Sequence, residues 1–432
     1  MDLINVIRLI LHKGSDILTF EKLSAKQKQV FKWCYNNDYK ALICDGSVRS
    51  GKTISMITSF ILWAMDSFNG ATFGICGKTV QSTERNIIIP LESIIDITYY
   101  FNVKYIRSTH CLEVSTSKNC NKFYVFGGKD ESSYQLIQGI TLSGVFFDEV
   151  ALMPRSFVEQ AITRTISVEN SKLWFNCNPD SSEHWFYKEW VLKAQERKAL
   201  HLHFTMEDNP TLTKNQIEYA ESQFSGVFYD RYIKGLWVLA EGLVYSMFDN
   251  KNILDKYTSN SALYYISCDY GIKNPTSMGL WALEFDKAVR LKEFYWDGRE
   301  NHSKTDEELY QDLENLANGY NIQYVIVDPS ASSFIECIKR HKKFRVRKAD
   351  NDVIQGISNT STLIANKKLL VCKCCTDLLR ELKLYRWDEK SNKDQVIKEH
   401  DHACDDMRYF VNTVAGNRLL KGLIRKGGSN DD

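Results

Sequence analysis

Short apolar runs that alternate with helical patterns fill the first half of the chain. Five of these runs have the length and continuity of buried strands, at residues 41–44, 71–76, 122–126, 144–147 and 172–175. Buried strands separated by helices are typical of an α/β domain. We therefore expect a largely parallel sheet in this half.

A second series of apolar runs begins after residue 260. Its expected strands lie at residues 263–268, 277–283, 289–295 and 324–327, and helices follow near the C-terminus. The stretch between the two series contains Gly242 and a polar segment from Asp249, which is typical of a domain boundary. We expect two α/β domains, at residues 1–240 and 261–432, joined by a linker at 241–260.

Composition agrees with two globular domains. The chain has 432 residues, of which 44% are hydrophobic and 25% charged, so it is neither disordered nor a coiled coil as a whole. Its 55 Lys and Arg against 54 Asp and Glu leave a net charge of +1. A nucleic-acid partner would therefore have to be held by a local basic patch.

Neither export nor a membrane span is expected. The apolar segment at residues 3–11 is interrupted by Arg8 and precedes no small-residue cleavage site, and the run at 57–65 is far shorter than the roughly 20 residues of a membrane helix. The 12 cysteines then indicate reduced thiols. The cluster at residues 372–375 lacks the CxxC pairs that would predict zinc.

A nucleotide-binding pattern follows the first strand. From Gly46 to Thr53 the chain reads G-x-x-x-x-G-K-T, and a helical pattern begins at Ile54. The glycines let backbone N–H groups surround phosphates, Lys52 reaches the outer phosphates, and the Thr53 hydroxyl can bind Mg²⁺. An ordinary glycine turn is the alternative, but the strand-loop-helix context favours phosphate binding. The predicted residues are Gly46, Ser50, Gly51, Lys52 and Thr53.

Two adjacent acids end the apolar run at residues 145–147. Asp148 would hold the metal near Thr53, and Glu149 would orient and deprotonate an attacking water. Alone the pair is weak evidence, since any strand that leaves a core can end in solvated charge. Together with the loop at Lys52, it predicts hydrolysis of a nucleotide.

Two amide side chains extend the predicted nucleotide site. Gln27 lies before the first strand and could contact both the donor and the acceptor edge of adenine, although a surface glutamine is the alternative. The run at residues 172–175 is followed by Asn176 and Asn178, at the end of a strand where ligands of open α/β sheets bind. That position suits Asn178 as a sensor of the γ-phosphate.

Three aspartates in the second half predict a second site. Asp269 and Asp328 each follow an apolar run, and Asp405 lies in a helical stretch where His402, Asp405 and Tyr409 share a face. Oxygen ligands suit Mg²⁺ or Mn²⁺, and a pair of such ions can cleave a phosphodiester. Each aspartate alone is more simply a solvated strand end or a cap. His402 alone is more simply structural, although it could support the metal.

A dense basic run lies between the second and third acids. Residues 339–348 contain seven Lys or Arg in ten positions. Such a run is usually a solvated face, yet beside a metal site it could follow a DNA backbone. Both interpretations stay open for Lys342, Lys343 and Arg345.

The order of these motifs resembles the large terminase subunit of tailed double-stranded DNA bacteriophages, over nearly the whole chain. Besides the two acid sets, the resemblance rests on the segment ending at Gln27, the loop carrying Arg49, Phe175-Asn176-Cys177-Asn178-Pro179 followed by His184-Trp185, the junction from Gly235-Leu236-Trp237 to Glu241-Gly242, and the Asp-His-Ala-x-Asp pattern ending at Asp405.

The resemblance implies an additional-strand ATPase domain joined to a ribonuclease-H-like nuclease domain. With ATP and Mg²⁺ the protein would translocate double-stranded DNA into a procapsid, and with Mg²⁺ or Mn²⁺ it would cut concatemeric DNA. Arg49 would sense the γ-phosphate, and Arg164 would be a candidate for stabilising charge. The implied partners are double-stranded DNA, the portal protein and the small terminase subunit, around a homo-oligomeric ring in the host-cell cytoplasm, without a membrane.

One departure and two alternatives remain. Where the family pattern has one acid, this chain has two, Asp405 and Asp406, so either could be the helical metal ligand. Asp405 is preferred because it is fourth after Asp401 and third after His402. A helicase or translocase without a packaging role would share the nucleotide motifs but would not need three acids after residue 260. A scaffold with decayed sites would not need to keep Lys52 and Glu149.

Overall fold

The computed structural model of the chain describes residues 23–259, 261–271, 274–299, 301–389, 391 and 393–420. Two compact units divide the chain: one contains Met1–Thr213 and Asp230–Leu239, the other Lys214–Tyr229 and Ala240–Asp432. The apolar segment at residues 3–11 lies outside the described residues. Within the described part, no helix combines the length and the apolar character needed to cross a bilayer.

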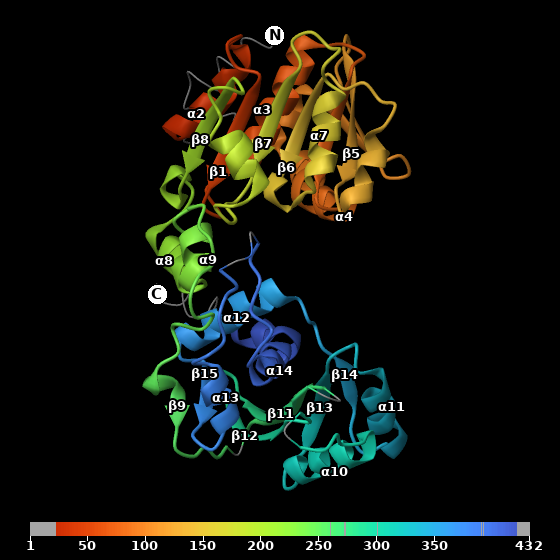
Figure 1. Cartoon of the computed structure of the whole chain (residues 1–432). Helices are drawn as coiled ribbons and strands as arrows, with labels where there is room; N and C mark the ends of the chain where they lie inside the picture. The colour runs from red at the N-terminus through yellow and green to blue at the C-terminus, as the bar shows by residue number, and fades with distance from the viewer. Residues whose placement is uncertain are drawn as a thin grey trace. The chain divides into compact units, whose positions relative to one another are not determined.

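The first unit is built on an eight-stranded sheet (Figure 1). Its spatial order is β3-β4-β5-β2-β6-β7-β1-β8, and from β5 to β8 every neighbouring pair is parallel. The strands are β1 (Ala41–Gly46), β2 (Thr72–Gly77), β3 (Asn102–Ile106), β4 (Cys111–Ser115), β5 (Cys120–Gly127), β6 (Gly144–Asp148), β7 (Lys172–Asn176) and β8 (Ala199–Phe204). The predicted mostly parallel sheet is confirmed.

Three strands of this sheet were not predicted. β3 and β4 form an antiparallel extension at one edge, and β8 forms the other edge. Edge strands carry polar residues on their outer side, so β3 reads NVKYI and β8 reads ALHLHF. Because these segments lack a continuous apolar run, their sequence does not indicate buried strands.

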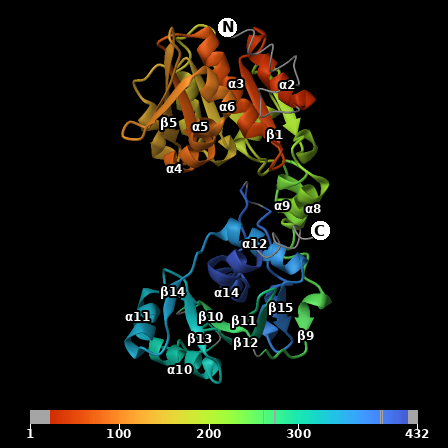
Figure 2. The ribbon, with the colours of Figure 1, turned by 180° about the vertical axis from the view of Figure 1, so that it is seen from behind.

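Helices cover both faces of the first sheet, which Figures 1 and 2 show from opposite sides. Alternate residues of β1 point into two different hydrophobic cores. Leu42 and Cys44 lie in the first core, and Ala41 and Ile43 lie in the second. The first core is filled by α3, which is buried along most of its length. The helices are α2 (Ala25–Lys32), α3 (Lys52–Ser67), α4 (Val80–Thr83), α5 (Ile89–Ser93), α6 (Ile95–Tyr100) and α7 (Arg155–Thr163).

The second unit contains a seven-stranded sheet of order β14-β13-β10-β11-β12-β15-β9. β10, β11 and β12 form an antiparallel meander, and the other neighbouring pairs are parallel. The strands are β9 (Ile253–Leu254), β10 (Leu263–Asp269), β11 (Thr276–Leu283), β12 (Ala288–Trp296), β13 (Ile322–Val327), β14 (Val346–Lys348) and β15 (Leu369–Cys372). The segment predicted as a linker, residues 241–260, thus contributes β9 to this sheet.

Helices pack on both sides of the second sheet (Figures 1 and 2), with α14 on one side and α10 on the other. Phe410 of α14 stacks on Trp281 of β11, with ring centroids 4.5 Å apart. This contact holds the polar face of α14 against the ends of the central strands. The helices of this unit are α8 (Lys214–Ser222), α10 (Asp306–Ala317), α11 (Ser332–His341), α12 (Val353–Ala365), α13 (Thr376–Glu381) and α14 (His402–Phe410). The residues of α9 (Gly226–Tyr232) are divided between the two units.

Candidate active sites

The loop between β1 and α3 is shaped by two glycines and closed around Lys52. Gly46 has φ +126°, and a Cβ there would lie 1.9 Å from the Phe204 carbonyl oxygen. Gly51, with φ +80°, starts α3 in the left-handed conformation. Nζ of Lys52 donates to the carbonyl oxygens of Gly46 at 3.1 Å and Ser47 at 2.7 Å. Burial lowers the pKa of Lys52 to about 8, so the ammonium form still prevails at neutral pH.

Asn176 brings the two predicted metal-binding groups of this site together. Its Nδ2 donates to Thr53 Oγ1 at 2.9 Å and to Asp148 Oδ1 at 2.7 Å. Burial raises the pKa of Asp148 to about 7, and the charge of Glu149 adds to the shift. A hydroxyl and a buried carboxylate at the end of a parallel strand are hard oxygen donors that fit Mg²⁺.

Glu149 directly follows β6 in a strained conformation. Its φ of 55° and ψ of 52° lie in the left-handed region, which residues other than glycine rarely adopt. Burial raises the pKa of this carboxyl above its ordinary value, while the Lys52 charge opposes the shift. A half-buried carboxylate with a raised pKa is a stronger proton acceptor than a solvated one, which suits a general base.

The two predicted amides both lie against the phosphate loop. A Cβ on Gly51 would lie 2.8 Å from Nε2 of Gln27. Oε1 of Gln27 accepts from the Ser24 backbone N–H at 3.0 Å, in the capping box that starts α2. Oδ1 of Asn178 accepts from Nζ of Lys52 at 3.2 Å. The capping box therefore aims Gln27 at the loop.

Of the two arginines implied by the resemblance, only Arg49 lies at the loop. Arg49 is exposed, with φ 59°, and Nδ2 of Asn209 donates to its carbonyl at 2.7 Å. Arg164 directly follows α7 as its C-cap, and its carbonyl accepts from the backbone N–H of Leu142, just before β6. Asp148 lies at the other end of β6, about 16 Å away for a five-residue strand. Arg164 therefore does not join the phosphate site of its own chain, because α7 returns antiparallel to β6.

Asp45 behind the loop was not predicted. This buried carboxylate, at the end of β1, lies 2.8 Å from Nε2 of His201 and 3.0 Å from Nδ1 of His203, and accepts from Nε1 of Trp237 at 2.7 Å. Burial alone would raise the pKa of Asp45, but the hydrogen bonds from the two histidines and Trp237 hold it below its usual range. The sequence of β8 did carry a signal for this cluster: His201 and His203 are two residues apart, so they lie on the same face of the strand.

In the second unit, Asp269 and Asp328 meet at neighbouring strand ends. β10 and β13 are parallel, and their last paired residues are Cys268 and Val327. Oη of Tyr409 donates to Asp328 Oδ2 at 2.7 Å and to Asp269 Oδ1 at 3.4 Å. Nδ1 of His402 lies 2.7 Å from the other oxygen of Asp269. The polar face of α14 thus reaches both strand acids.

The electrostatics of this acid cluster fit a cation. Burial raises the pKa of Asp269 to about 6, and the nearby Asp405 adds to the shift while His402 opposes it. Burial would also raise the pKa of Asp328, but hydrogen bonds from Ser330 and Tyr409 lower it. Crowded carboxylates with hard oxygen donors favour Mg²⁺ or Mn²⁺ over their own protons at neutral pH.

The two adjacent acids of α14 face different surroundings. Asp405 lines a pocket of about 520 Å³ together with Asp269. Asp406 is fully buried, and Arg290 donates to its two oxygens at 2.6 and 3.0 Å. Ser267 also donates to Asp406, at 2.8 Å. Both acids have a buried arginine partner, since Arg408 lies 3.0 Å from Asp405 Oδ1, but only Asp405 also lines the pocket beside Asp269.

Two cations that line this pocket were not predicted. Arg299 and Lys398 contribute to its wall, and Nζ of Lys398 lies 3.2 Å from Asp405 Oδ2. Neither belongs to a charge run, so nothing in the neighbouring sequence marked them. They place positive charge in the wall of the pocket, beside the acids.

The basic run at residues 339–348 spans the end of α11 and β14, and acids offset part of it. Lys339 pairs with Glu336 at 2.7 Å and Lys343 with Glu314 at 2.8 Å. Arg340 pairs with Glu307 at 3.3 Å. Lys342 and Arg345 are exposed. The run is therefore a mixed surface rather than a uniformly positive one.

Comparison with known proteins matches both units. The family model of the terminase large subunit, T4likevirus-type, N-terminal, matches residues 43–251, and that of the terminase RNaseH-like domain matches residues 269–413. A large terminase from a thermophilic bacteriophage is 47% identical, with a TM-score of 0.84, over 91% of this chain and 99% of that chain. This chain belongs to the large terminase family.

Two further structures of the same thermophilic-phage protein contain nucleotides. Its complex with ADP is 46% identical with a TM-score of 0.81, and its complex with ATP-γ-S is 45% identical with a TM-score of 0.80, each over 91% of this chain and 99% of that chain. The large terminase subunit of Escherichia phage T5 is 21% identical over 291 residues, 63% of this chain. That match spans 65% of the T5 protein, less than two thirds of its length.

In this large terminase the family matches cover both sites. The first match contains the phosphate loop and Glu149, and Gln27 lies before it. The second begins at Asp269 and contains Asp328, Asp405 and the basic run. The expected ribonuclease-H-like fold of the second half is confirmed.

Proposed function

We propose that this large terminase is a DNA-packaging motor subunit, which hydrolyses ATP to move double-stranded DNA into a procapsid and cuts concatemeric DNA with its own endonuclease. One observation carries the proposal: the described residues of the first unit gather a phosphate loop with Asp148 and Glu149, and those of the second gather Asp269, Asp328 and Asp405. The helicase alternative explains only the first set, because strand separation needs no acid cluster in the second unit.

The motor reaction is assigned to residues 1–240. Lys52 exchanges the carbonyl oxygens of Gly46 and Ser47 for phosphate oxygens, and Asn178 senses the γ-phosphate through its contact with Lys52. Thr53 and Asp148, held by Asn176, would bind Mg²⁺. The bound ion supplies neutralisation of phosphate charge. Glu149 takes the proton of the attacking water.

Three further groups complete the assignment at the motor site. Gln27 reads the adenine, because its amide reaches the loop at Gly51. Arg49, exposed on the loop, senses the γ-phosphate. Ser50 accepts from Nζ of Lys52 at 3.2 Å and helps to orient it. The complexes of the thermophilic-phage protein with ADP and ATP-γ-S support nucleotide binding by this chain.

The nuclease reaction is assigned to residues 261–432. Asp269, Asp328 and Asp405 would bind Mg²⁺ or Mn²⁺, which supplies an activated water and stabilises the leaving oxygen. His402 orients Asp269, and Tyr409 holds Asp269 and Asp328 at the spacing set by the two strands.

The helical metal ligand is tested by exchanging the two adjacent acids separately. Asp405→Asn is expected to abolish cleavage, because its carboxylate lines the pocket beside Asp269, and also to lower stability, because this carboxylate pairs with the buried Arg408 at 3.0 Å. Asp406→Asn removes the closer of the two carboxylates that compensate buried Arg290, the other being Glu293, and is expected to lower the free energy of unfolding by up to about 3–5 kcal/mol. Plasmid cleavage and urea unfolding of both variants measure this. Loss of cleavage in a stable Asp406→Asn protein, with Asp405→Asn active, would move the ligand by one residue.

DNA binding by the basic run is tested through salt dependence. Exchange of Lys342 and Arg345 for glutamine is expected to reduce the slope of log affinity against log salt by about 0.9 for each phosphate that is no longer neutralised. Lys343→Gln is the matched control, and should change the slope less because Glu314 already pairs with that lysine. Filter-binding titrations with duplex DNA measure the slopes. An unchanged slope in the double variant would mean that the basic run is a solvated face and does not bind DNA.

The proposed partners are double-stranded DNA, the portal protein and the small terminase subunit, on a homo-oligomeric ring at the procapsid in the host cytoplasm. The deciding experiment combines purified chain, portal-bearing procapsids and DNA, with or without the small subunit. ATP-dependent protection of DNA from added nuclease is the expected result. Strand separation of short duplexes without any protection would favour the helicase alternative.

A further inference from the structure

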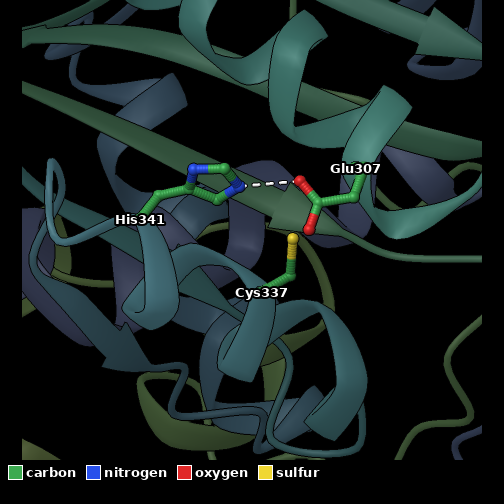
Figure 3. Close-up of side chains that lie close together, drawn as sticks. All are labelled: Glu307, Cys337 and His341. Carbon is green, nitrogen blue, oxygen red and sulfur yellow. Dashed lines mark hydrogen bonds and ion pairs between the residues drawn. The ribbon is translucent and has the colours of Figure 1, made fainter.

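A group of three different metal-binding side chains lies outside both sites. Glu307 is in the first turn of α10, and Cys337 and His341 are on α11. One potential ligand atom from each of the three lies within 4.8 Å of the other two. Figure 3 shows the three side chains pointing toward one another.

The fold orients each of these side chains. Cys337 and His341 are four residues apart, so they project from one face of α11. The His341 ring stacks on Tyr310 with centroids 3.8 Å apart and planes at 8°. This stacking turns Nε2 toward Glu307, 2.7 Å from its Oε2. Thr305 caps α10 and fixes the turn that carries Glu307.

Ion pairs account for Glu307, which contacts both His341 and Arg340, and for His341, but not for the Cys337 thiol. His341 at the end of α11 and Glu307 at the start of α10 attract each other and suit the helix dipoles. Neither effect requires a cysteine, yet the fully buried Cys337 faces the same carboxylate. A thiol, a carboxylate and an imidazole together form a set of ligands that suits a metal ion of intermediate softness.

We propose that Glu307, Cys337 and His341 form a Zn²⁺ site with a fourth position open to water. Oxygen, nitrogen and sulfur together favour Zn²⁺ over Mg²⁺ or Ca²⁺, which prefer oxygen alone. Bonds of about 2.0–2.3 Å in a tetrahedron place ligand atoms about 3.3–3.6 Å apart. The present separations need only small side-chain shifts, since Glu307 and His341 are 51% and 38% exposed.

This site is separate from the nuclease acids and clamps a different part of the unit. Asp328 precedes the amino end of α11, whereas His341 is its last residue, about 15 Å further along the ten-residue helix. The ion would tie α11 to α10 directly before the exposed Lys342. It would therefore fix the start of the basic segment that follows α11. The proposal does not depend on the packaging function.

Cobalt spectroscopy of the full chain tests the site. Co²⁺ is added to the reduced Asp269→Asn protein, in which the nuclease acids are weakened as ligands. We expect a thiolate-to-cobalt charge-transfer band that saturates at a single equivalent and is displaced by Zn²⁺. Cys337→Ser should lose the band, and Cys120→Ser, which removes an exposed cysteine of β5, should keep it.

Two surface variants keep the test valid if Cys337→Ser folds poorly. Glu307→Gln and His341→Gln should weaken cobalt binding by more than the about 10- to 100-fold typical of an outer-shell partner. Zn²⁺ should also raise the melting temperature of the parent protein and not of these variants. Absence of the band in the parent, or its persistence in Cys337→Ser, would overturn the proposal.

Discussion

Exchange of Glu149 for alanine is expected to slow ATP hydrolysis by about 10²- to 10⁴-fold while ATP binding is retained. The carboxylate directly follows β6, beside Asp148, and the strained backbone holds it out of the strand. Loss of this group removes the acceptor for the proton of the attacking water, but leaves the phosphate loop intact. Steady-state phosphate release and fluorescent-nucleotide titration measure the two effects.

Three other variants serve as comparisons and controls for the Glu149→Ala result. Glu149→Gln keeps the shape and should be nearly as slow, since an amide does not accept the proton. Lys52→Ala should weaken both binding and turnover, because Lys52 is the buried cation of the loop. Glu159→Gln, on the exposed face of α7, should change neither. Normal hydrolysis by a folded Glu149→Ala protein would remove the assignment of the base.

Exchange of Asp269 for asparagine is expected to reduce DNA cleavage by at least about 10³-fold without changing ATP hydrolysis. A bound metal contributes several kcal/mol of charge stabilisation in the transition state, and Asp269 lies between His402 and Tyr409 at the centre of the cluster. The motor site has its own donors, Thr53 and Asp148. Supercoiled plasmid in millimolar Mn²⁺ and a parallel ATPase assay measure the two reactions.

Metal binding should also raise the free energy of unfolding. Mn²⁺ at a hundred times its dissociation constant should raise the free energy of unfolding by about 2.7 kcal/mol in the parent, and much less in Asp269→Asn. Asp286→Asn, an exposed acid between β11 and β12, is the control and should keep the full gain. The full chain is used, because a fragment starting at residue 255 would lack β9 and its pairing with β15. Equal cleavage and equal stabilisation in parent and Asp269→Asn would contradict the nuclease assignment.

Local sequence determined the parts of this protein that depend on contiguous residues. The phosphate loop is one turn between a strand and a helix, so its glycines, Lys52 and Thr53 were recognisable together. Asp148, Asp269 and Asp328 were predicted because a continuous apolar run ends at each of them, and such runs mark buried parallel strands. The order of these segments was also enough to indicate the family.

Tertiary structure alone decided which side chains meet. Arg164 suits the phosphates by its residue type, but the path of α7 puts it at the wrong end of β6. Asp405 and Asp406 are adjacent in sequence, but Asp406 pairs with the buried Arg290 of β12, whereas Asp405 pairs with Arg408 and lines the pocket. Asp45 with its histidines, and Glu307 with Cys337 and His341, come from separate segments. The physical reason is that sequence periodicity specifies the face of an element, whereas packing specifies what that face meets.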